Sequence, residues 1–139
     1  MHKVFFSLGS NLGDRKETIE HAISMLGSEV GAVTRRSSLY ETEPWGFKSS
    51  HGFLNAAVCC ETVLTPHGVL DVTQHIERAL GRRQKSSGGC YHDRPIDIDI
   101  LTYDDITMHD ATLTIPHPLM HQRDFVMRPL REILRPGEE

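Results

Sequence analysis

The sequence predicts an α+β fold in which helices pack on an antiparallel sheet, and three observations lead to it. β-rich apolar runs and helical runs follow one another in the order strand, helix, strand, strand, helix, strand, with a helical tail. The length of 139 residues is that of one ordinary domain, and 38% hydrophobic with 24% charged residues is normal for a globular chain. No internal repeat, linker or low-complexity tract interrupts this order. The βαββαβ pattern is that of a ferredoxin-like αβ sandwich, and we expect one domain over residues 1–139.

The first half of the chain predicts a strand, a helix and a second strand. Residues 3–8 are β-rich and end at the turn sequence "GSNLGD". Asp14 can cap the following helix, in which apolar residues repeat at helical spacing until Gly27, where we expect the helix to stop. Residues 30–40 are small and β-branched, so they predict one further strand.

The second half repeats the alternation after a polar loop over residues 41–52. "FLNAAVCCETVL" predicts a strand, and Thr65 as N-cap with Pro66 at the first helical position opens a helix that ends at Gly81. A basic, glycine- and serine-bearing loop leads to the strand "IDIDILTY", and a short strand is expected over residues 113–115. "DFVMRPLREIL" predicts a last helix that Pro129 breaks or kinks.

Composition excludes several classes of protein. The net charge of −4 lacks the strongly basic character of a nucleic-acid-binding chain, and no apolar run approaches the length needed to span a bilayer. Polar residues interrupt the apolar N-terminus before the core of a signal peptide could form. Cys59, Cys60 and Cys90 do not describe a disulfide framework. We therefore expect a cytoplasmic protein without nucleic-acid or membrane partners.

Asp97 and Asp99 are the first candidate functional residues. In "RPIDIDIL" isoleucine and aspartate alternate, so both carboxylates project from the same face of a strand, with Cα atoms roughly 6.5 Å apart. Such a pair can bind Mg²⁺, which prefers oxygen ligands and takes one or two protein carboxylates together with water and substrate phosphates. The alternative is a solvated strand face whose acids discourage edge pairing. The pair alone does not decide between them.

Basic residues just before the pair favour the metal interpretation. Arg82, Arg83, Lys85 and Arg94 offer donors matched to phosphate oxygens. An ordinary solvated loop would explain these cations taken alone. A basic loop that leads into two carboxylates is the arrangement expected for a metal–polyphosphate ligand, so together they indicate a nucleotide site.

Three further groups of residues leave alternatives open. "GSNLGD" lacks the GK[ST] ending of a P-loop, so it predicts a tight turn more than a phosphate cradle. His117 and His121 have HxxxH spacing without the HExxH glutamate, and His117 near Arg123 fits a phosphate contact better than zinc. Phe53, Phe125 and Asn55 could stack on and read a flat heterocycle, although core packing explains either phenylalanine singly.

Six segments, in this order, resemble the 6-hydroxymethyl-7,8-dihydropterin pyrophosphokinase family over nearly the whole chain. They are "SLGSNLGDR", "YETEPWG", "FLNAA", "IERALGR", "RPIDIDIL" and "IPHPLMHQRDFV". The resemblance implies an Mg²⁺-dependent transferase of folate biosynthesis that moves diphosphate from ATP to the hydroxymethyl group of the reduced pterin, leaving AMP. It also implies that ATP and the pterin are the partners and that the protein is a monomer, with a weak dimer left open.

The resemblance also implies site residues. Asp97 and Asp99 would hold two Mg²⁺ ions, and Arg82 and Arg94 would contact the ATP phosphates from a loop that closes over them. The other implied nucleotide-binding residues are Gln74, Glu77, Lys85, Ile100, Thr114, His117 and Arg123. The implied pterin-binding residues are Phe53 and Phe125, which would sandwich the ring, Asn55 at its edge, and backbone groups around Thr42, Glu43 and Trp45.

Two competing functions remain at this point. Another Mg²⁺–ATP phosphotransferase would yield ADP instead of AMP. A ferredoxin-like RNA-binding module would need exposed sheet aromatics in a basic setting, and the expected strands are poor in both. A metal carrier would need soft thiolate or imidazole ligands, which "DID" does not offer.

Overall fold

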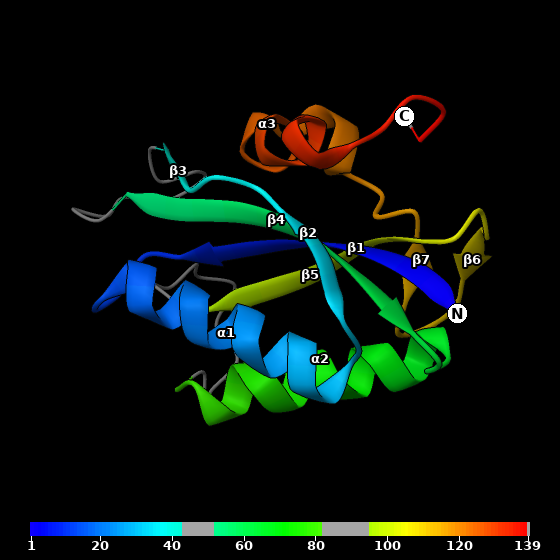
Figure 1. Cartoon of the computed structure of the whole chain (residues 1–139), viewed down its shortest axis with the longest axis horizontal. Helices are drawn as coiled ribbons and strands as arrows, with labels where there is room; N and C mark the ends of the chain where they lie inside the picture. The colour runs from blue at the N-terminus through cyan, green and yellow to red at the C-terminus, as the bar shows by residue number, and fades with distance from the viewer. Residues whose placement is uncertain (43–51, 82–94, 139) are drawn as a thin grey trace.

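An antiparallel sheet built around the N-terminal strand organises the molecule (Figure 1). The computed structural model describes residues 1–42, 52–81 and 95–138. Strand β1 lies between β4 and β5, and the outer edge of β4 pairs with both β2 and β3. The strands are β1 (His2–Ser10), β2 (Val33–Arg36), β3 (Tyr40–Thr42), β4 (Phe53–Thr62) and β5 (Asp97–Tyr103).

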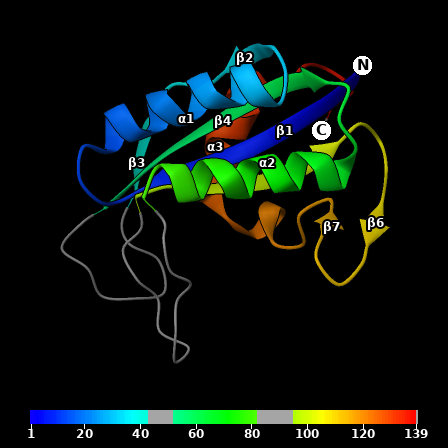
Figure 2. The ribbon, with the colours of Figure 1, turned by 90° about the horizontal axis from the view of Figure 1, so that it is seen from below.

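Helices cover both faces of this sheet. Helices α1 (Arg15–Glu29) and α2 (Pro66–Ala79) lie side by side on one face, and α3 (Asp124–Ile133) packs on the other (Figures 1 and 2). The alternation of side chains along each strand creates two cores. Val4, Phe6 and Leu8 of β1 belong to the core shared with α1 and α2, whereas Phe5 belongs to the core shared with α3. We call the second surface the α3 face of the sheet.

The predicted helix starts are confirmed by their caps. The Asp14 carboxylate accepts a hydrogen bond from the backbone N–H of Glu17 at 3.1 Å, and the Thr65 hydroxyl accepts one from the N–H of Gly68 at 3.0 Å. Each cap satisfies one of the backbone donors that a helix leaves unpaired in its first turn. Pro66, which follows Thr65, has no N–H to lose at this position.

Three predicted boundaries are wrong in detail. Helix α1 runs through Gly27 to Glu29, and the glycine that the fold requires is Gly31, where a Cβ atom would lie 1.9 Å from the carbonyl oxygen of Glu61. The single strand predicted over residues 30–40 is two strands, β2 and β3, separated at the buried Ser37. Strand β1 continues through Gly9 to Ser10, two residues into the predicted turn "GSNLGD". The predicted last helix is confirmed as α3, which Pro129 does not break.

Short elements lead from β5 to α3. The two-residue strands β6 (Met108–His109) and β7 (Thr114–Ile115) pair with each other, and a 3-10 helix (Met120–Gln122) precedes α3. The expected short strand near residue 114 is therefore confirmed, whereas its partner β6 had no clear sequence signal.

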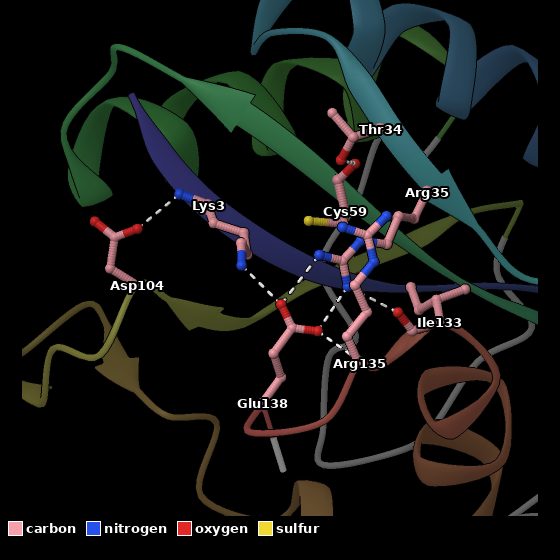
Figure 3. A network of polar contacts seen from close by, with 8 residues as sticks. All are labelled: Lys3, Thr34, Arg35, Cys59, Asp104, Ile133, Arg135 and Glu138. Atoms are coloured by element: carbon pink, nitrogen blue, oxygen red, sulfur yellow. Dashed lines mark hydrogen bonds and ion pairs between the residues drawn. The ribbon is translucent and has the colours of Figure 1, made fainter.

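A polar network joins the first strand to the last described residues (Figure 3). The Glu138 carboxylate binds Lys3 Nζ at 2.7 Å and the Arg35 guanidinium at 2.6 and 3.0 Å. Arg35 also donates to the backbone oxygen of Ile133 at 2.9 Å. These contacts hold the segment after α3 against β1 and β2.

Among the described helices, none has the length and apolar character to cross a membrane.

Candidate active site

One end of the sheet gathers the predicted functional residues on the α3 face. Gly9 of β1 pairs with Asn55 of β4 on one side and with Asp97 of β5 on the other. Two residues earlier in β1, Ser7 pairs with Ala57 of β4 and with Asp99 of β5. Because Ile98 and Ile100 point into the core shared with α1 and α2, the alternating Asp97 and Asp99 point to the α3 face. Asn55 and both aspartates therefore share this face.

Gly9 makes room for the side chains beside it. A Cβ atom at Gly9 would lie 3.2 Å from Asn55 Oδ1 and 3.5 Å from Phe53 Cδ1, so the amide and the ring lie against this backbone. Sequence reasoning did not single out Gly9. The sequence predicted Gly9 as the first residue of the turn "GSNLGD", whereas β1 runs through it to Ser10. A glycine inside a strand often marks the close approach of another group.

The Asn55 amide has a fixed orientation. Asn55 is only 2% exposed, and its Nδ2 donates to Thr42 Oγ1 at 2.8 Å and to the backbone oxygen of Tyr40 at 3.5 Å. The resemblance assigned Thr42 a backbone role, whereas the structure gives its hydroxyl a direct contact with this amide. Phe53, Asn55 and Thr42 form the β3–β4 side of the candidate site.

His117 and Arg123 form the opposite side, and the His117 imidazole interacts with the charges of both Arg123 and Asp97. The His117 backbone N–H donates to the oxygen of Leu101 at 2.9 Å, which fixes this loop on β5. Burial, and then the nearby Arg123 charge, lower the pKa of His117, while the Asp97 carboxylate opposes this shift. The imidazole is therefore biased toward its neutral form, in which it can donate or accept a hydrogen bond. Arg123 Cζ lies 5.5 Å from the centre of the Phe125 ring at the start of α3.

Glu77 fixes the start of β5 from α2. Its carboxylate accepts a hydrogen bond from the backbone N–H of Ile98 at 2.7 Å, and the residue is 9% exposed. Ile98 lies between the two aspartates in sequence, so this bond holds the backbone from which both carboxylates project. The resemblance predicted Glu77 at the nucleotide, and its contact with β5 was not predicted.

Three other predicted nucleotide residues lie on α2, in β7 and in the core beneath β5. Gln74 is exposed on α2, and the Thr114 hydroxyl in β7 lies 3.1 Å from His109 Nδ1. The Ile100 side chain is 5% exposed within the core shared with α1 and α2, which leaves its backbone as the group able to contact a ligand. Five predicted site residues lie outside the described part of the chain: Arg82, Lys85, Arg94, Glu43 and Trp45.

The donor set at Asp97 and Asp99 fits Mg²⁺. Both residues are partly buried and both carboxylates face the same side of β5. Within residues 1–42, 52–81 and 95–138 no group of three or more His, Cys, Asp or Glu side chains could enclose a metal. Two carboxylates on one face suit Mg²⁺, which takes one or two protein carboxylates and keeps several water ligands together with substrate phosphates.

Comparison with known proteins decides the family. The family model described as 7,8-dihydro-6-hydroxymethylpterin-pyrophosphokinase (HPPK) matches residues 5–135. The chain belongs to this family.

Relatives in the HPPK family share much of the sequence. The 2-amino-4-hydroxy-6-hydroxymethyldihydropteridine pyrophosphokinase of Porphyromonas gingivalis is 53% identical over 94% of this chain and 89% of its own length. The enzymes of the same name from Methylorubrum extorquens and Bacillus subtilis are 42% and 39% identical, over 96% and 97% of this chain and 83% and 80% of their own lengths.

Solved structures of HPPK-DHPS proteins confirm the ferredoxin-like fold. The Plasmodium falciparum HPPK-DHPS A437G variant with SDX-DHP superposes with a TM-score of 0.79 at 17% identity, covering 99% of this chain. An HPPK-DHPS in complex with substrates gives a TM-score of 0.73 at 15% identity, covering 95% of this chain. This chain spans 42% and 40% of the length of those two chains, so the likeness concerns their HPPK part.

Proposed function

We propose that the chain transfers diphosphate from ATP to 6-hydroxymethyl-7,8-dihydropterin in an Mg²⁺-dependent reaction, with Asp97 and Asp99 as the metal ligands. The transfer itself, a step of folate biosynthesis, follows from the family and from the shared name of relatives that are 39–53% identical. The metal and the roles of individual residues are our proposal. The observation that carries it is the convergence of two carboxylates, a buried amide, an arginine and a histidine at one end of the sheet.

The β3–β4 side suits the pterin. We assign Phe53 and Phe125 to the two faces of the ring, since flat heterocycles are held by stacking, and Asn55 to its hydrogen-bonding edge. Support comes from the Phe53 ring and the Asn55 amide lying together over Gly9. The Thr42 hydroxyl accepts one Asn55 donor, so it fixes which atoms of the amide the pterin meets. Glu43 and Trp45 remain proposed backbone contacts.

The β5 side suits ATP. We assign Arg123 to the phosphates as a fixed positive charge and His117, in its neutral form, to a hydrogen bond with the nucleotide. Support for these roles is the electrostatic interaction of His117 with both Arg123 and Asp97. Glu77, Gln74, Thr114 and the Ile100 backbone remain proposed nucleotide contacts, and Arg82, Lys85 and Arg94 remain proposed phosphate contacts.

In the proposed mechanism the chain aligns the pterin hydroxyl with the β-phosphorus of ATP and offsets the negative charge of the phosphates. The pterin hydroxyl oxygen forms a bond to the β-phosphorus of ATP. The bond between that phosphorus and the oxygen that bridges it to the α-phosphorus breaks, and AMP leaves with this oxygen. The hydroxyl proton passes to solvent. Asp97 and Asp99 would hold Mg²⁺, which when bound offsets the negative charge of the phosphates. Phe53, Phe125 and Asn55 orient the hydroxymethyl group, and Arg123 stabilises charge on the phosphates. Positioning and electrostatics, without a side-chain general base, supply the catalysis.

Metal removal tests this proposal. Enzyme stripped with EDTA is mixed with ATP and the pterin, and AMP is measured while Mg²⁺ is titrated back. We expect no AMP without metal and a saturable return of turnover with Mg²⁺, because the charge of the phosphates is then offset. Wild-type turnover in excess chelator would contradict the metal requirement.

We further propose that residues 1–139 act as one domain, as a monomer in the cytoplasm. Contacts between Lys3 and Glu138 support a single body, and the buried, unpaired thiols of Cys59 and Cys60 fit a reducing compartment. Light scattering coupled to gel filtration tests the monomer: a mass near 15.7 kDa is expected, and a stable dimer would contradict it.

A further inference from the structure

Glu132, near the end of α3, binds the segment that leads into β3. Its Oε1 accepts a hydrogen bond from the Tyr40 hydroxyl at 2.6 Å. Its Oε2 accepts hydrogen bonds from the backbone N–H of Ser38 at 2.9 Å and from the Ser38 hydroxyl at 3.2 Å. We call Glu132, Tyr40 and Ser38 the α3–β3 tether.

Neighbouring contacts hold the tether at both ends. Arg128, one turn before Glu132 on α3, places its Cζ 5.3 Å from the centre of the Tyr40 ring. Ser37, just before the tether, donates from its backbone N–H to the Ala57 oxygen at 2.8 Å and accepts from the Ala57 N–H at 2.9 Å. The segment before β3 is thus attached to α3 on one side and to β4 on the other.

Both elements that the tether joins contribute to the candidate pterin pocket. Tyr40 pairs with Asn55 across the β3–β4 ladder, and its carbonyl oxygen lies 3.5 Å from Asn55 Nδ2. Thr42, two residues along the same strand, holds the Asn55 amide. Helix α3 begins at Asp124 and carries Phe125 in its first turn. The tether therefore connects the helix that carries one proposed aromatic wall to the strand that orients the amide.

We infer that Glu132 and Tyr40 are positioning residues, which set the distance between Phe125 on α3 and the Phe53–Asn55 wall on β4. The inference rests on the proposed function, because the pterin roles of these three residues are themselves proposals. Glu132 is exposed and Tyr40 is only partly buried, and polar contacts at such positions contribute little to global stability. Their effect should appear in pterin binding more than in the free energy of unfolding.

Conservative substitutions test the inference. Tyr40→Phe removes only the hydroxyl, Glu132→Ala removes the acceptor, and Glu132→Gln keeps one oxygen that can accept from Tyr40. The matched control is Glu20→Gln, because Glu20 makes a comparable two-bond contact with Arg36, which ties α1 to β2 away from the site. The readouts are the KM values for pterin and ATP, kcat, and the Tm.

We expect Tyr40→Phe to raise the pterin KM by about 3- to 10-fold, which is the range for one lost hydrogen bond. Glu132→Ala also removes both Ser38 contacts, so it should raise the pterin KM by at least as much. The ATP KM should stay within about 2-fold, the Tm shift should match that of Glu20→Gln, and Glu132→Gln should lie between wild type and Glu132→Ala. Wild-type pterin KM in Tyr40→Phe and Glu132→Ala, or equal losses for pterin and ATP, would overturn the inference.

An Asn55→Ala variant separates this inference from the proposed function. If Asn55→Ala weakens pterin binding while the tether variants do not, the tether has no positioning role and the pterin pocket stands. If Asn55→Ala leaves pterin binding unchanged, both the pocket assignment and the inference that rests on it are overturned.

Discussion

Each residue of β5 has its role set by the face on which it lies. Ile98 and Ile100 are buried against α1 and α2, and this burial forces Asp97 and Asp99 onto the α3 face. Burying two isoleucine side chains contributes several kcal/mol, about 1.5–3 kcal/mol each, which outweighs the repulsion between two partly exposed carboxylates. The apolar residues therefore hold both acids on the α3 face of the sheet.

Substituting either aspartate tests this arrangement at the residue scale. We expect Asp97→Asn and Asp99→Asn to lower kcat by about 10²-fold or more at ordinary Mg²⁺, because an amide oxygen carries no net charge to hold the metal. The far-UV circular dichroism spectrum should stay as in wild type. Asp105→Asn, in the exposed turn after β5, is the control for loss of one acid. Full activity in either site variant would refute the metal role.

Gly9 gives a second test at the same scale. We expect Gly9→Ala to raise the pterin KM several-fold while the ATP KM changes little, because the added methyl group would press on Asn55 Oδ1 at 3.2 Å. Gly27→Ala is the control. Gly27 lies in the interior of α1, and a Cβ atom there would make an ordinary 3.6 Å contact with Val33 of β2. Steady-state kinetics with each substrate varied would check the difference, and an unchanged pterin KM in Gly9→Ala would contradict it.

At the scale of elements, α2 supports β5 through Glu77. We expect Glu77→Ala to lower the free energy of unfolding by about 1–3 kcal/mol, because the buried N–H of Ile98 would lose its acceptor. Glu77→Gln keeps an acceptor oxygen and should lose less. Urea denaturation measures both. Equal losses in the two variants would show that the Ile98 hydrogen bond is not the cause.

Local signals predicted the elements well, and distant contacts explain what they missed. Asp14 and Thr65 cap helices that begin at the next residue, and the alternation in β5 lies within one strand. The sequence alone was therefore sufficient to predict these features. The end of α1 depended on Gly31, whose requirement for glycine comes from Glu61, thirty residues away in the chain. The Glu77–Ile98 hydrogen bond and the α3–β3 tether also join residues far apart in sequence, so no local sequence pattern predicts them.

At the scale of the whole molecule, Glu138 joins both ends of the described chain. The hydrogen bonds from Arg35, and then from Lys3, hold the pKa of this carboxyl well below its usual range. A glutamate whose pKa is lower in the folded than in the unfolded state stabilises the fold above its ordinary pKa of about 4.3, and this stability is lost as the pH falls below that value.

Glu138→Gln removes the charge of this carboxyl and tests its contribution. We expect the free energy of unfolding of wild type to exceed that of Glu138→Gln by about 1–3 kcal/mol near pH 7, and this difference should shrink as the pH falls from about 5 toward 3. Urea denaturation at several pH values, with Asp105→Asn as the control for net charge, measures the margin. A margin that stays constant or widens in acid would exclude the ion pairs as its source.

The family, the fold and the convergence of Asp97, Asp99, Asn55 and Arg123 at one end of the sheet lead to one central claim, that diphosphate passes from ATP to the reduced pterin. Identification of both products tests it most directly. Wild-type enzyme with Mg²⁺, ATP and 6-hydroxymethyl-7,8-dihydropterin should yield AMP and pterin diphosphate in equal amounts, measured by ion-exchange chromatography and mass spectrometry. ADP with a pterin monophosphate, or AMP with free diphosphate, would contradict the claim.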